Sequence, residues 1–255
     1  MGKITAFSNQ KGGVGKTTSC VNIAAYLAGF SKKVLLVDLD PQGNATTGLG
    51  VNKAEIENSI YSALIDDVPV KNCIVPTNIK NLSIIPSNID LAGAEVELVP
   101  VSGREKKMKT TLDTIKNDFD FIFIDCPPSL GLLTVNALIA SDSLIIPIQS
   151  EYYALEGLSQ LMNTIKLVKK INPALEIDGV LITMYDGRSL ISKDIAQEIS
   201  KFFGKKLFAA YIPRNVRLNE APSHGVPIML HDPKCAGAKA YLQITEEYLA
   251  RSGSR

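Results

Sequence analysis

Short apolar runs alternate with longer stretches of helical periodicity along nearly the whole chain. The runs are rich in Val, Ile, Leu and Phe without regular polar alternation, which is typical of strands covered on both faces in a parallel sheet. Strands are predicted over residues 4–7, 33–38, 82–86, 119–125, 143–148, 178–183 and 207–211. Helical segments are predicted over residues 18–28, 54–65, 88–117, 155–171, 191–203 and 236–249. This order predicts an α/β fold, a mostly parallel twisted sheet with helices on both faces.

The chain of 255 residues has no Pro-, Gly- or Ser-rich linker and no internal repeat, so we expect a single domain over residues 1–255. No run of 18 apolar residues occurs, and no membrane span is expected. Polar residues 8–11 interrupt the first apolar run too early for a signal peptide. The four cysteines form no C-x-x-C pair. These features predict a cytoplasmic protein with reduced thiols.

Charge is unevenly distributed along the chain, although the net charge is only +1. Residues 1–183 carry 16 Lys and Arg against 19 Asp and Glu, and residues 184–255 carry 11 against 7. The last third therefore has a net charge of +4, which suits an anionic partner. Solvated surface charge is the structural alternative.

The first predicted strand and the first predicted helix are joined by residues 8–18, with the sequence SNQKGGVGKTT. Strand, glycine-rich loop and helix are the arrangement of a phosphate-binding P-loop, in which backbone N–H groups and the helix N-terminus surround a phosphate. Lys16 is placed to reach the β- and γ-phosphates, and the Thr17 hydroxyl to bind Mg²⁺. A glycine-rich turn without a nucleotide is the structural alternative. The loop departs from the general pattern because Gln10 stands where a glycine is usual, and a second lysine, Lys11, follows it.

Carboxylates follow two of the predicted buried strands. Asp38 and Asp40 lie at the end of the strand over 33–38, and Asp125 ends the strand over 119–125. Side chains at the carboxyl ends of parallel strands face the ligand crevice. An apolar strand that ends in aspartate is the Walker B arrangement, in which the carboxylate binds the metal or its water. A plain strand-to-loop turn explains the residues around Asp40 without any chemistry.

The loop with its extra lysine resembles the deviant Walker A motif of the ParA/MinD ATPases. Further similar stretches cover nearly the whole chain and bring it closest to the small chromosomal, Soj-like partition proteins. They are residues 37–44 (VDLDPQGN), 124–128 (IDCPP), 151–157 (EYYALEG) and 212–225 (IPRNVRLNEAPSHG).

The resemblance implies a Mg²⁺-dependent ATPase that forms an ATP-bound sandwich dimer, coats double-stranded DNA without sequence preference, and is released when a ParB-like partner stimulates hydrolysis to ADP. Lys11 then reaches the nucleotide of the other subunit, and Asp40 acts on the attacking water. Nucleotide-binding residues are expected to be Gly12, Gly13, Val14, Gly15, Lys16, Thr17 and Thr18, with Met184, Pro213, Arg214 and Asn215 around the adenine. Mg²⁺ ligands are expected at Thr17, Asp40 and Asp125. Arg188 and Arg217 are the candidates for DNA contact, and the protein is expected on the nucleoid in the cytoplasm.

Three rival functions use the same kind of loop. A MinD-like regulator of cell division ends in a basic amphipathic membrane helix, whereas residues 246–255 lack that pattern. An iron–sulfur carrier needs cysteines that here are single and scattered, although a dimer axis could bring two together. A pure binding module would use nucleotide only as a switch, and Asp40 argues for at least slow hydrolysis.

Overall fold

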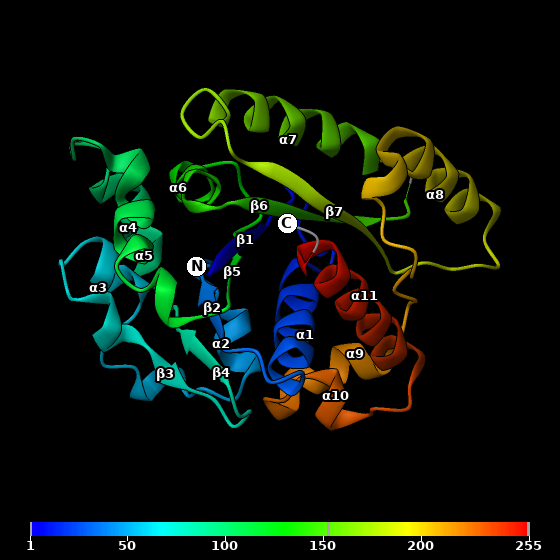
Figure 1. Ribbon diagram of the computed structural model, residues 1–255, viewed down its shortest axis with the longest axis horizontal. Helices are drawn as coiled ribbons and strands as arrows, with labels where there is room; N and C mark the ends of the chain where they lie inside the picture. The colour runs from blue at the N-terminus through cyan, green and yellow to red at the C-terminus, as the bar shows by residue number, and fades with distance from the viewer. Residues whose placement is uncertain (1, 152–153, 254–255) are drawn as a thin grey trace.

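The computed structural model describes residues 2–151 and 154–253, with side-chain burial left undescribed for 154–157. One seven-stranded sheet runs through these residues in the order β3-β4-β2-β5-β1-β6-β7 (Figure 1). The strands are β1 (Lys3–Phe7), β2 (Val34–Asp38), β3 (Val75–Pro76), β4 (Leu82–Ile85), β5 (Phe121–Asp125), β6 (Ser143–Gln149) and β7 (Glu176–Thr183). The predicted α/β fold with a mostly parallel sheet is confirmed.

Every strand pair is parallel except β3 with β4, at the edge of the sheet. The register sets Phe7 and Asp38 on either side of Asp125. Three neighbouring strands therefore end at the same level, and the loops that follow them start from one edge. This edge holds the candidate site.

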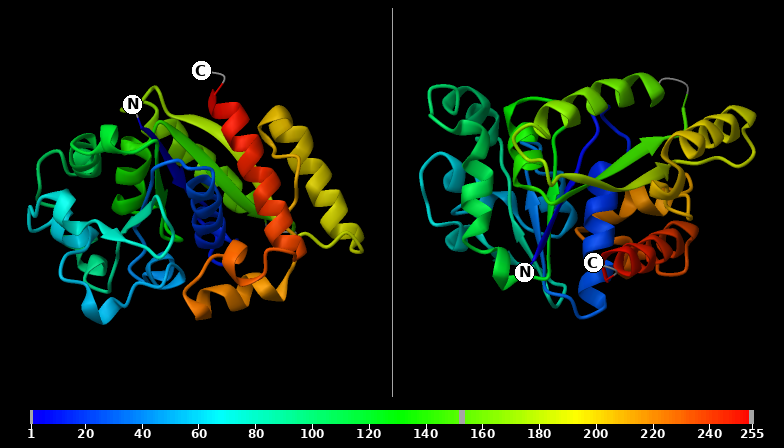
Figure 2. Two further views of the ribbon diagram at one scale, coloured as in Figure 1. Left: turned by 60° about the horizontal axis from the view of Figure 1, so that its bottom comes forward. Right: turned by 45° about the horizontal axis from the view of Figure 1, so that its top comes forward.

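Helices cover both faces of the sheet, as Figures 1 and 2 show from different sides. On one face, α1 (Lys16–Gly29) and α11 (Ala236–Gly253) pack together, with Phe7, Leu36 and Phe123 beneath them. On the other face, α6 (Leu132–Ala140), α7 (Ala154–Val168) and α8 (Leu190–Phe203) contribute to a core with alternate strand residues. The remaining α-helices are α2 (Asn44–Gly48), α3 (Ile60–Leu64), α4 (Leu91–Glu97), α5 (Lys107–Asp113), α9 (Val216–Glu220) and α10 (Ile228–His231). Short 3₁₀ helices are η1 (Lys53–Glu55), η2 (Val70–Cys73), η3 (Arg104–Lys106), η4 (Lys116–Asp118), η5 (Gly204–Lys206) and η6 (Ala221–His224).

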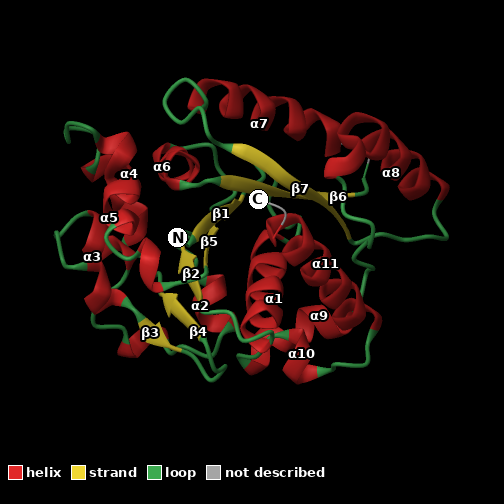
Figure 3. Cartoon of the chain, in the orientation of Figure 1, coloured by secondary structure: helices red, strands yellow, loops and turns green. Residues whose placement is uncertain are grey.

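The strand predicted over residues 207–211 is wrong. Residues 207–215, between η5 and α9, form no strand (Figure 3), and among the described residues they pair only at two isolated bridges, Val180 of β7 with Leu207 and Tyr185 with Pro213. The hydrogen bonding of this stretch to β7 is interrupted at Ala209, because the Ala209 N–H donates instead to the Glu247 side chain on α11, 3.0 Å away. Pairing with the β7 side resumes only at the Ile212 N–H, which donates to the Ile182 carbonyl at 2.9 Å.

Other predicted boundaries shift because local caps divide longer segments. The helix predicted over 54–65 is split into η1 and α3, since Ser59 forms a capping box with Ser62 at the start of α3. The helical region over 88–117 is likewise broken into α4, η3, α5 and η4. The family motif over 151–157 is described for Glu151 alone, because residues 152–153 and the side chains of 154–157 lie outside the described residues.

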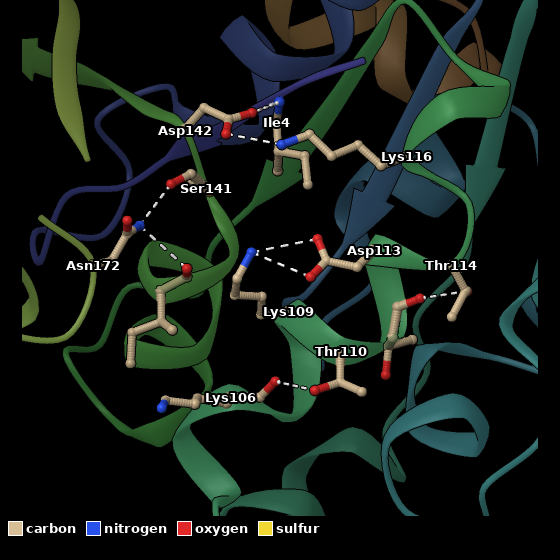
Figure 4. A network of polar contacts seen from close by, with 12 residues as sticks. Ile4, Lys106, Lys109, Thr110, Asp113, Thr114, Lys116, Ser141, Asp142 and Asn172 are labelled. Carbon is tan, nitrogen blue, oxygen red and sulfur yellow. Dashed lines mark hydrogen bonds and ion pairs between the residues drawn. The ribbon is translucent and has the colours of Figure 1, made fainter. Parts of the chain in front are cut away.

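Polar contacts hold the sheet at the edge opposite the site. Asp142, just before β6, accepts hydrogen bonds from the Ile4 N–H and the Lys116 ammonium, each at 2.8 Å (Figure 4). The Asn172 amide donates to the Ser141 carbonyl at 2.8 Å. These contacts pin the start of β1 beside β6 and fix the level at which both strands end.

Two glycines bring the segment after α2 against the segment after η6. Gly50 and Gly225 both have positive φ, +78° and +64°. A Cβ built on Gly225 would lie only 2.8 Å from the Gly50 Cα, so the two backbones touch where side chains would keep them apart. This contact joins the loop after β2 to the late part of the chain.

In the part of the chain that the structure describes, no helix combines the length and the apolar character needed to cross a lipid bilayer.

Candidate nucleotide-binding site

A cavity of about 670 Å³ opens at the carboxyl edge of the sheet. Most of its lining comes from three segments: the glycine loop with the start of α1, the residues from Asp40 to Gly48, and the residues from Leu218 to Pro227; Pro128 and Met184 complete it. The loop and α1 come from the first tenth of the chain, and the last segment lies some 200 residues later. The fold therefore brings together the two ends of the sequence at one site.

The glycine loop has the conformation expected of a phosphate cradle. Gly13 and Gly15 have φ of +72° and +80°, which side chains rarely adopt, and Gly15 is the N-cap of α1. No side chain caps the first turn of α1. The N–H groups at the start of this 14-residue helix consequently face the cavity lined by Lys16, Thr17 and Thr18.

Lys16 is buried, with only 6% of its surface exposed, and its ammonium donates to the Lys11 carbonyl at 3.1 Å. Burial lowers the pKa of this lysine, while Asp125, Cys126 and Asp40 oppose the shift. A buried cation beside acidic groups at a helix N-terminus is well suited to a polyphosphate.

Asp125 is fully buried, and neither carboxylate oxygen makes a hydrogen bond of good geometry with the described residues. Burial and the charge of Asp38 raise the pKa of Asp125 well above its usual range, while the Thr17 hydroxyl and the Lys16 ammonium oppose the shift. The buried Asp125 carboxylate, without a well-formed hydrogen bond, and the nearby Thr17 hydroxyl offer oxygen atoms as ligands for a hard cation. This donor set fits Mg²⁺, which proteins bind through one or two carboxylates together with substrate phosphates.

Asp38 and Asp40 have different roles in the structure. Asp40 lines the cavity, is 8% exposed, and accepts a hydrogen bond from the Gln42 N–H at 2.9 Å. Asp38 lies beneath the cavity, fully buried, and accepts hydrogen bonds from the Thr46 N–H and hydroxyl. Burial raises the pKa of Asp38 to about 6, against the lowering effect of these bonds.

A smaller cavity of about 70 Å³ adjoins the first and holds the residues predicted to surround the adenine: Met184, Pro213, Arg214 and Asn215. Met184 has φ +51°, a conformation that is strained for a methionine and that occurs at functional sites. Its loop is held by the Tyr185 N–H, which donates to the Ile212 carbonyl at 2.9 Å. The structure thus brings the four residues together beside Gly15 and Thr18.

Lys11 does not line the main cavity. Its ammonium lies 3.1 Å from Glu151, the residue after β6 and the turn at Ser150. Glu151 also contacts Arg214 at 3.3 Å and the Gln149 amide at 2.5 Å. In this subunit, Lys11 is therefore paired with a carboxylate at the rim of the site.

The two candidate DNA-contacting arginines are exposed and paired with nearby acids. Arg188 has 93% of its side chain exposed and lies 3.0 Å from Asp186. Arg217 lies 2.8 Å from Glu220 and 3.6 Å from Asp232. Exposed ion pairs of this kind contribute little to stability and leave the cations accessible.

Sequence reasoning missed several residues that line the site. Asn219, Pro222, Ser223 and Pro227 line the main cavity, and Tyr241 from α11 lines the smaller one. The stretch over 212–225 carried part of the family resemblance. Which of its residues line the main cavity depends on how α9 and η6 fold over the glycine loop, and the sequence does not show this. Tyr241 gave no signal, since it reads as one apolar position of an amphipathic helix.

The chain is similar to proteins of known family. The family model described as an AAA domain matches residues 2–177. The sporulation initiation inhibitor protein Soj of Bacillus subtilis is 57% identical, over 98% of this chain and 99% of that protein. The chromosome-partitioning ATPase Soj of Treponema pallidum is 48% identical, over the whole of both chains.

Solved structures with the same fold include nucleotide complexes. The cobyrinic acid a,c-diamide synthase of Mycobacterium smegmatis, with bound ATP analogue and magnesium, has a TM-score of 0.89 and 38% identity, over 100% of this chain and 96% of that chain. The cell division ATPase MinD of Pyrococcus furiosus has a TM-score of 0.81 and 27% identity, over 98% of this chain and 99% of that chain.

Proposed function

We propose, since this chain belongs to the Soj/ParA family of chromosome-partitioning ATPases, that it hydrolyses ATP with Mg²⁺ and uses the reaction to position DNA. The observation that carries the proposal is the fully buried Asp125 carboxylate, which lacks a well-formed hydrogen bond and lies by Lys16 at the foot of the glycine loop. Such a carboxylate is costly unless a cation meets it. Mg²⁺ carried by ATP supplies that cation.

Each residue of the site has a distinct task. The backbone N–H groups of residues 12–18 and the Lys16 ammonium bind the β- and γ-phosphates. Thr17, Asp40 and Asp125 would hold Mg²⁺, which would neutralise charge on the phosphates. Asp40 orients the attacking water and accepts its proton. Met184 and the residues from Pro213 to Asn215 enclose the adenine.

Lys11 serves the nucleotide of a second subunit. Its ammonium is at the rim, already paired with an acid, and stands outside the cavity of its own subunit. Dimerisation face to face would move it from Glu151 to the partner's phosphates, where a cation stabilises charge that develops in phosphoryl transfer. The proposed active species is therefore an ATP-bound homodimer.

The dimer binds double-stranded DNA without sequence preference through Arg188 and Arg217, and a ParB-like protein triggers hydrolysis and release. The basic excess of residues 184–255 supports this assignment. Residues 1–255 form a single domain in the proposal, because both helical layers pack on one sheet. The protein works on the nucleoid, in the cytoplasm. The 48% identity to the chromosome-partitioning ATPase Soj of Treponema pallidum, against 27% to MinD, favours partition over a role in cell division.

The test is ATP turnover by two site variants and a control. Asp40→Ala should bind ATP and lose turnover by roughly 10²–10⁴-fold, the usual contribution of a positioned proton acceptor. Lys16→Ala should lose ATP binding in a fluorescent-nucleotide titration. Asp113→Ala, an exposed carboxylate on α5, should match the wild type in both measurements. Turnover by Asp40→Ala at the wild-type rate would contradict the role of Asp40.

A further inference from the structure

Thr46, on α2, has a place in the site that the nucleotide-binding motifs do not explain. The side chain is fully buried and does not line the cavity, although its neighbours Asn44, Thr47 and Gly48 do. Its hydroxyl donates to the Asp38 carboxylate at 2.7 Å and accepts a hydrogen bond from the Ser87 N–H at 3.0 Å. One hydroxyl thus connects the end of β2 with the residues after β4.

We propose that Thr46 is a positioning residue for ATP hydrolysis, fixing the loop that carries Asp40 by tying it to Asp38 and Ser87. The inference rests on the proposed function, since it takes Asp40 as the group that acts on water. Thr46 itself touches neither nucleotide nor water and acts through Asp40.

The loop from residue 38 to residue 46 is closed into a ring by Asp38. Its carboxylate accepts from the Thr46 N–H at 2.8 Å and from the Thr46 hydroxyl, and the Asp40 N–H lies 3.3 Å from its other oxygen. Asp40 is therefore held inside the ring, two residues from one end. Asp38 is the last residue of β2, an interior strand between β4 and β5, so the ring is anchored in the sheet.

The second connection runs to the neighbouring strand. Ser87, fully buried, follows β4, which pairs with β2 in parallel register. Its N–H is satisfied by the Thr46 hydroxyl, so the ring is held from two strands rather than one. Only a side chain that donates and accepts at the same atom can make both bonds, and of the small residues only Ser and Thr do so.

This tether matters because hydrolysis requires Asp40 to be placed precisely. A displacement of about 1 Å in a catalytic group can cost on the order of 10²-fold in rate. In the proposed function, the glycine loop and Lys16 bind the ATP phosphates, whereas the Thr46 hydroxyl hydrogen-bonds to Asp38 and Ser87. Loss of the hydroxyl should therefore lower kcat and leave KM for ATP nearly unchanged.

The test compares Thr46→Val, which removes the hydroxyl at nearly constant shape, with Thr46→Ser, which keeps it. Thr46→Val should lower kcat by roughly 10- to 100-fold with KM within about twofold, and Thr46→Ser should restore most of the rate. The matched control is Thr245→Val: Thr245 is also fully buried, and its hydroxyl donates to the Tyr241 carbonyl within α11 at 2.7 Å. This control should lose stability like Thr46→Val and keep the wild-type kcat.

Amide hydrogen exchange of the nucleotide-free proteins gives a readout that does not depend on hydrolysis. Thr46→Val should speed exchange in peptides covering residues 39–47 and 86–88, while Thr245→Val should leave them unchanged. A wild-type kcat in Thr46→Val, no rescue by Thr46→Ser, or an equal fall in Thr245→Val would overturn the assignment. A wild-type protein without ATPase activity would instead overturn the proposed function, and unchanged exchange in Thr46→Val would overturn the tether itself.

Discussion

Asp125 has two features that both disfavour its charged form in the nucleotide-free protein. It is fully buried without a well-formed hydrogen bond, and it lies in register with Asp38, whose charge acts in the same direction as burial. The folded protein therefore favours the protonated carboxyl. A binding site for a cation is built here at the expense of the stability of the empty protein.

We expect Asp125→Asn to stabilise the protein without nucleotide and Mg²⁺, and to do so more at higher pH. The pKa of Asp125 is raised above its unfolded value, so the penalty is absent below the unfolded pKa of about 3.8 and grows as pH rises through the folded pKa. Between the unfolded and the folded pKa of Asp125, the free energy of unfolding of Asp125→Asn should exceed that of the wild type by a margin that grows by up to about 1.4 kcal/mol per pH unit. Urea unfolding at several pH values between 5 and 8 measures it. Asp113→Asn, on the surface, should give a nearly constant difference, and a pH-independent gain for Asp125→Asn would contradict the explanation.

Residues of the site were predictable from sequence where the signal is local. Lys16 and Thr17 lie in one contiguous motif, Asp125 ends an apolar strand, and Asp40 follows the end of another by two residues. Residues 151–157 carried part of the family resemblance, but nothing local predicted that Glu151 pairs with Lys11 across 140 positions or that Tyr241 lines the smaller cavity. Their contacts arise only when distant segments meet, and no local pattern encodes that meeting.

Among the elements, α2 and η6 depend on each other through Gly50 and Gly225. Gly50 follows the cavity-lining residues 40–48, and Gly225 lies within the cavity-lining stretch 218–227. A shift at this backbone contact would therefore move residues 218–227 and change the width of the main cavity.

Gly225→Ala should destabilise the protein by about 2–5 kcal/mol, because it combines a left-handed backbone penalty of ~1–2 kcal/mol with overpacking of ~1–3 kcal/mol. It should also weaken binding of an ATP analogue. Gly103→Ala is the matched control: Gly103 has a similar φ of +70°, with no atom within 4 Å of the built Cβ, so it should show the backbone penalty alone. Urea unfolding and an analogue titration give both quantities. Equal losses in the two variants would show that the Gly50 contact is unimportant.

Elements with strong, uninterrupted patterns were predicted with errors of only a few residues, as for β2, β6 and α8. Failures occurred where a tertiary contact overrides the local pattern. The apolar run over 207–211 is not a strand, because α11 takes the Ala209 N–H through Glu247. The edge strand β3 was missed because it has only two residues, one of them a proline.

At the scale of the whole molecule, the basic excess of residues 184–255 concerns the DNA-binding proposal. We expect Asp40→Ala, held with ATP as a dimer, to bind unrelated duplexes with similar affinity and with strong dependence on salt. Adding Arg188→Ala or Arg217→Ala should weaken binding and reduce the slope of log affinity against log salt by about 0.9 for each DNA phosphate that the variant no longer neutralises, while sedimentation still reports a dimer.

Two controls accompany this titration. Arg104→Ala removes an exposed arginine from η3, outside the basic third, and should leave the affinity unchanged. Lys11→Ala should remain monomeric with ATP and bind DNA weakly. Unchanged affinity in both Arg188→Ala and Arg217→Ala would move the DNA surface elsewhere, and no binding by the trapped dimer would contradict the partition proposal.

The strand order has a consequence for how the protein is made. β1 lies between β5 and β6, and its loop holds the phosphate site, yet β5 ends at Asp125, 118 residues after Phe7. At a synthesis rate of about 5–20 residues per second, β1 waits roughly 6–24 s for its first neighbour. Meanwhile β2 can pair with β4, and β1 can join that part of the sheet only when β5 is available to lie between β2 and β1. The glycine loop is among the first segments to leave the ribosome and among the last to reach its binding geometry.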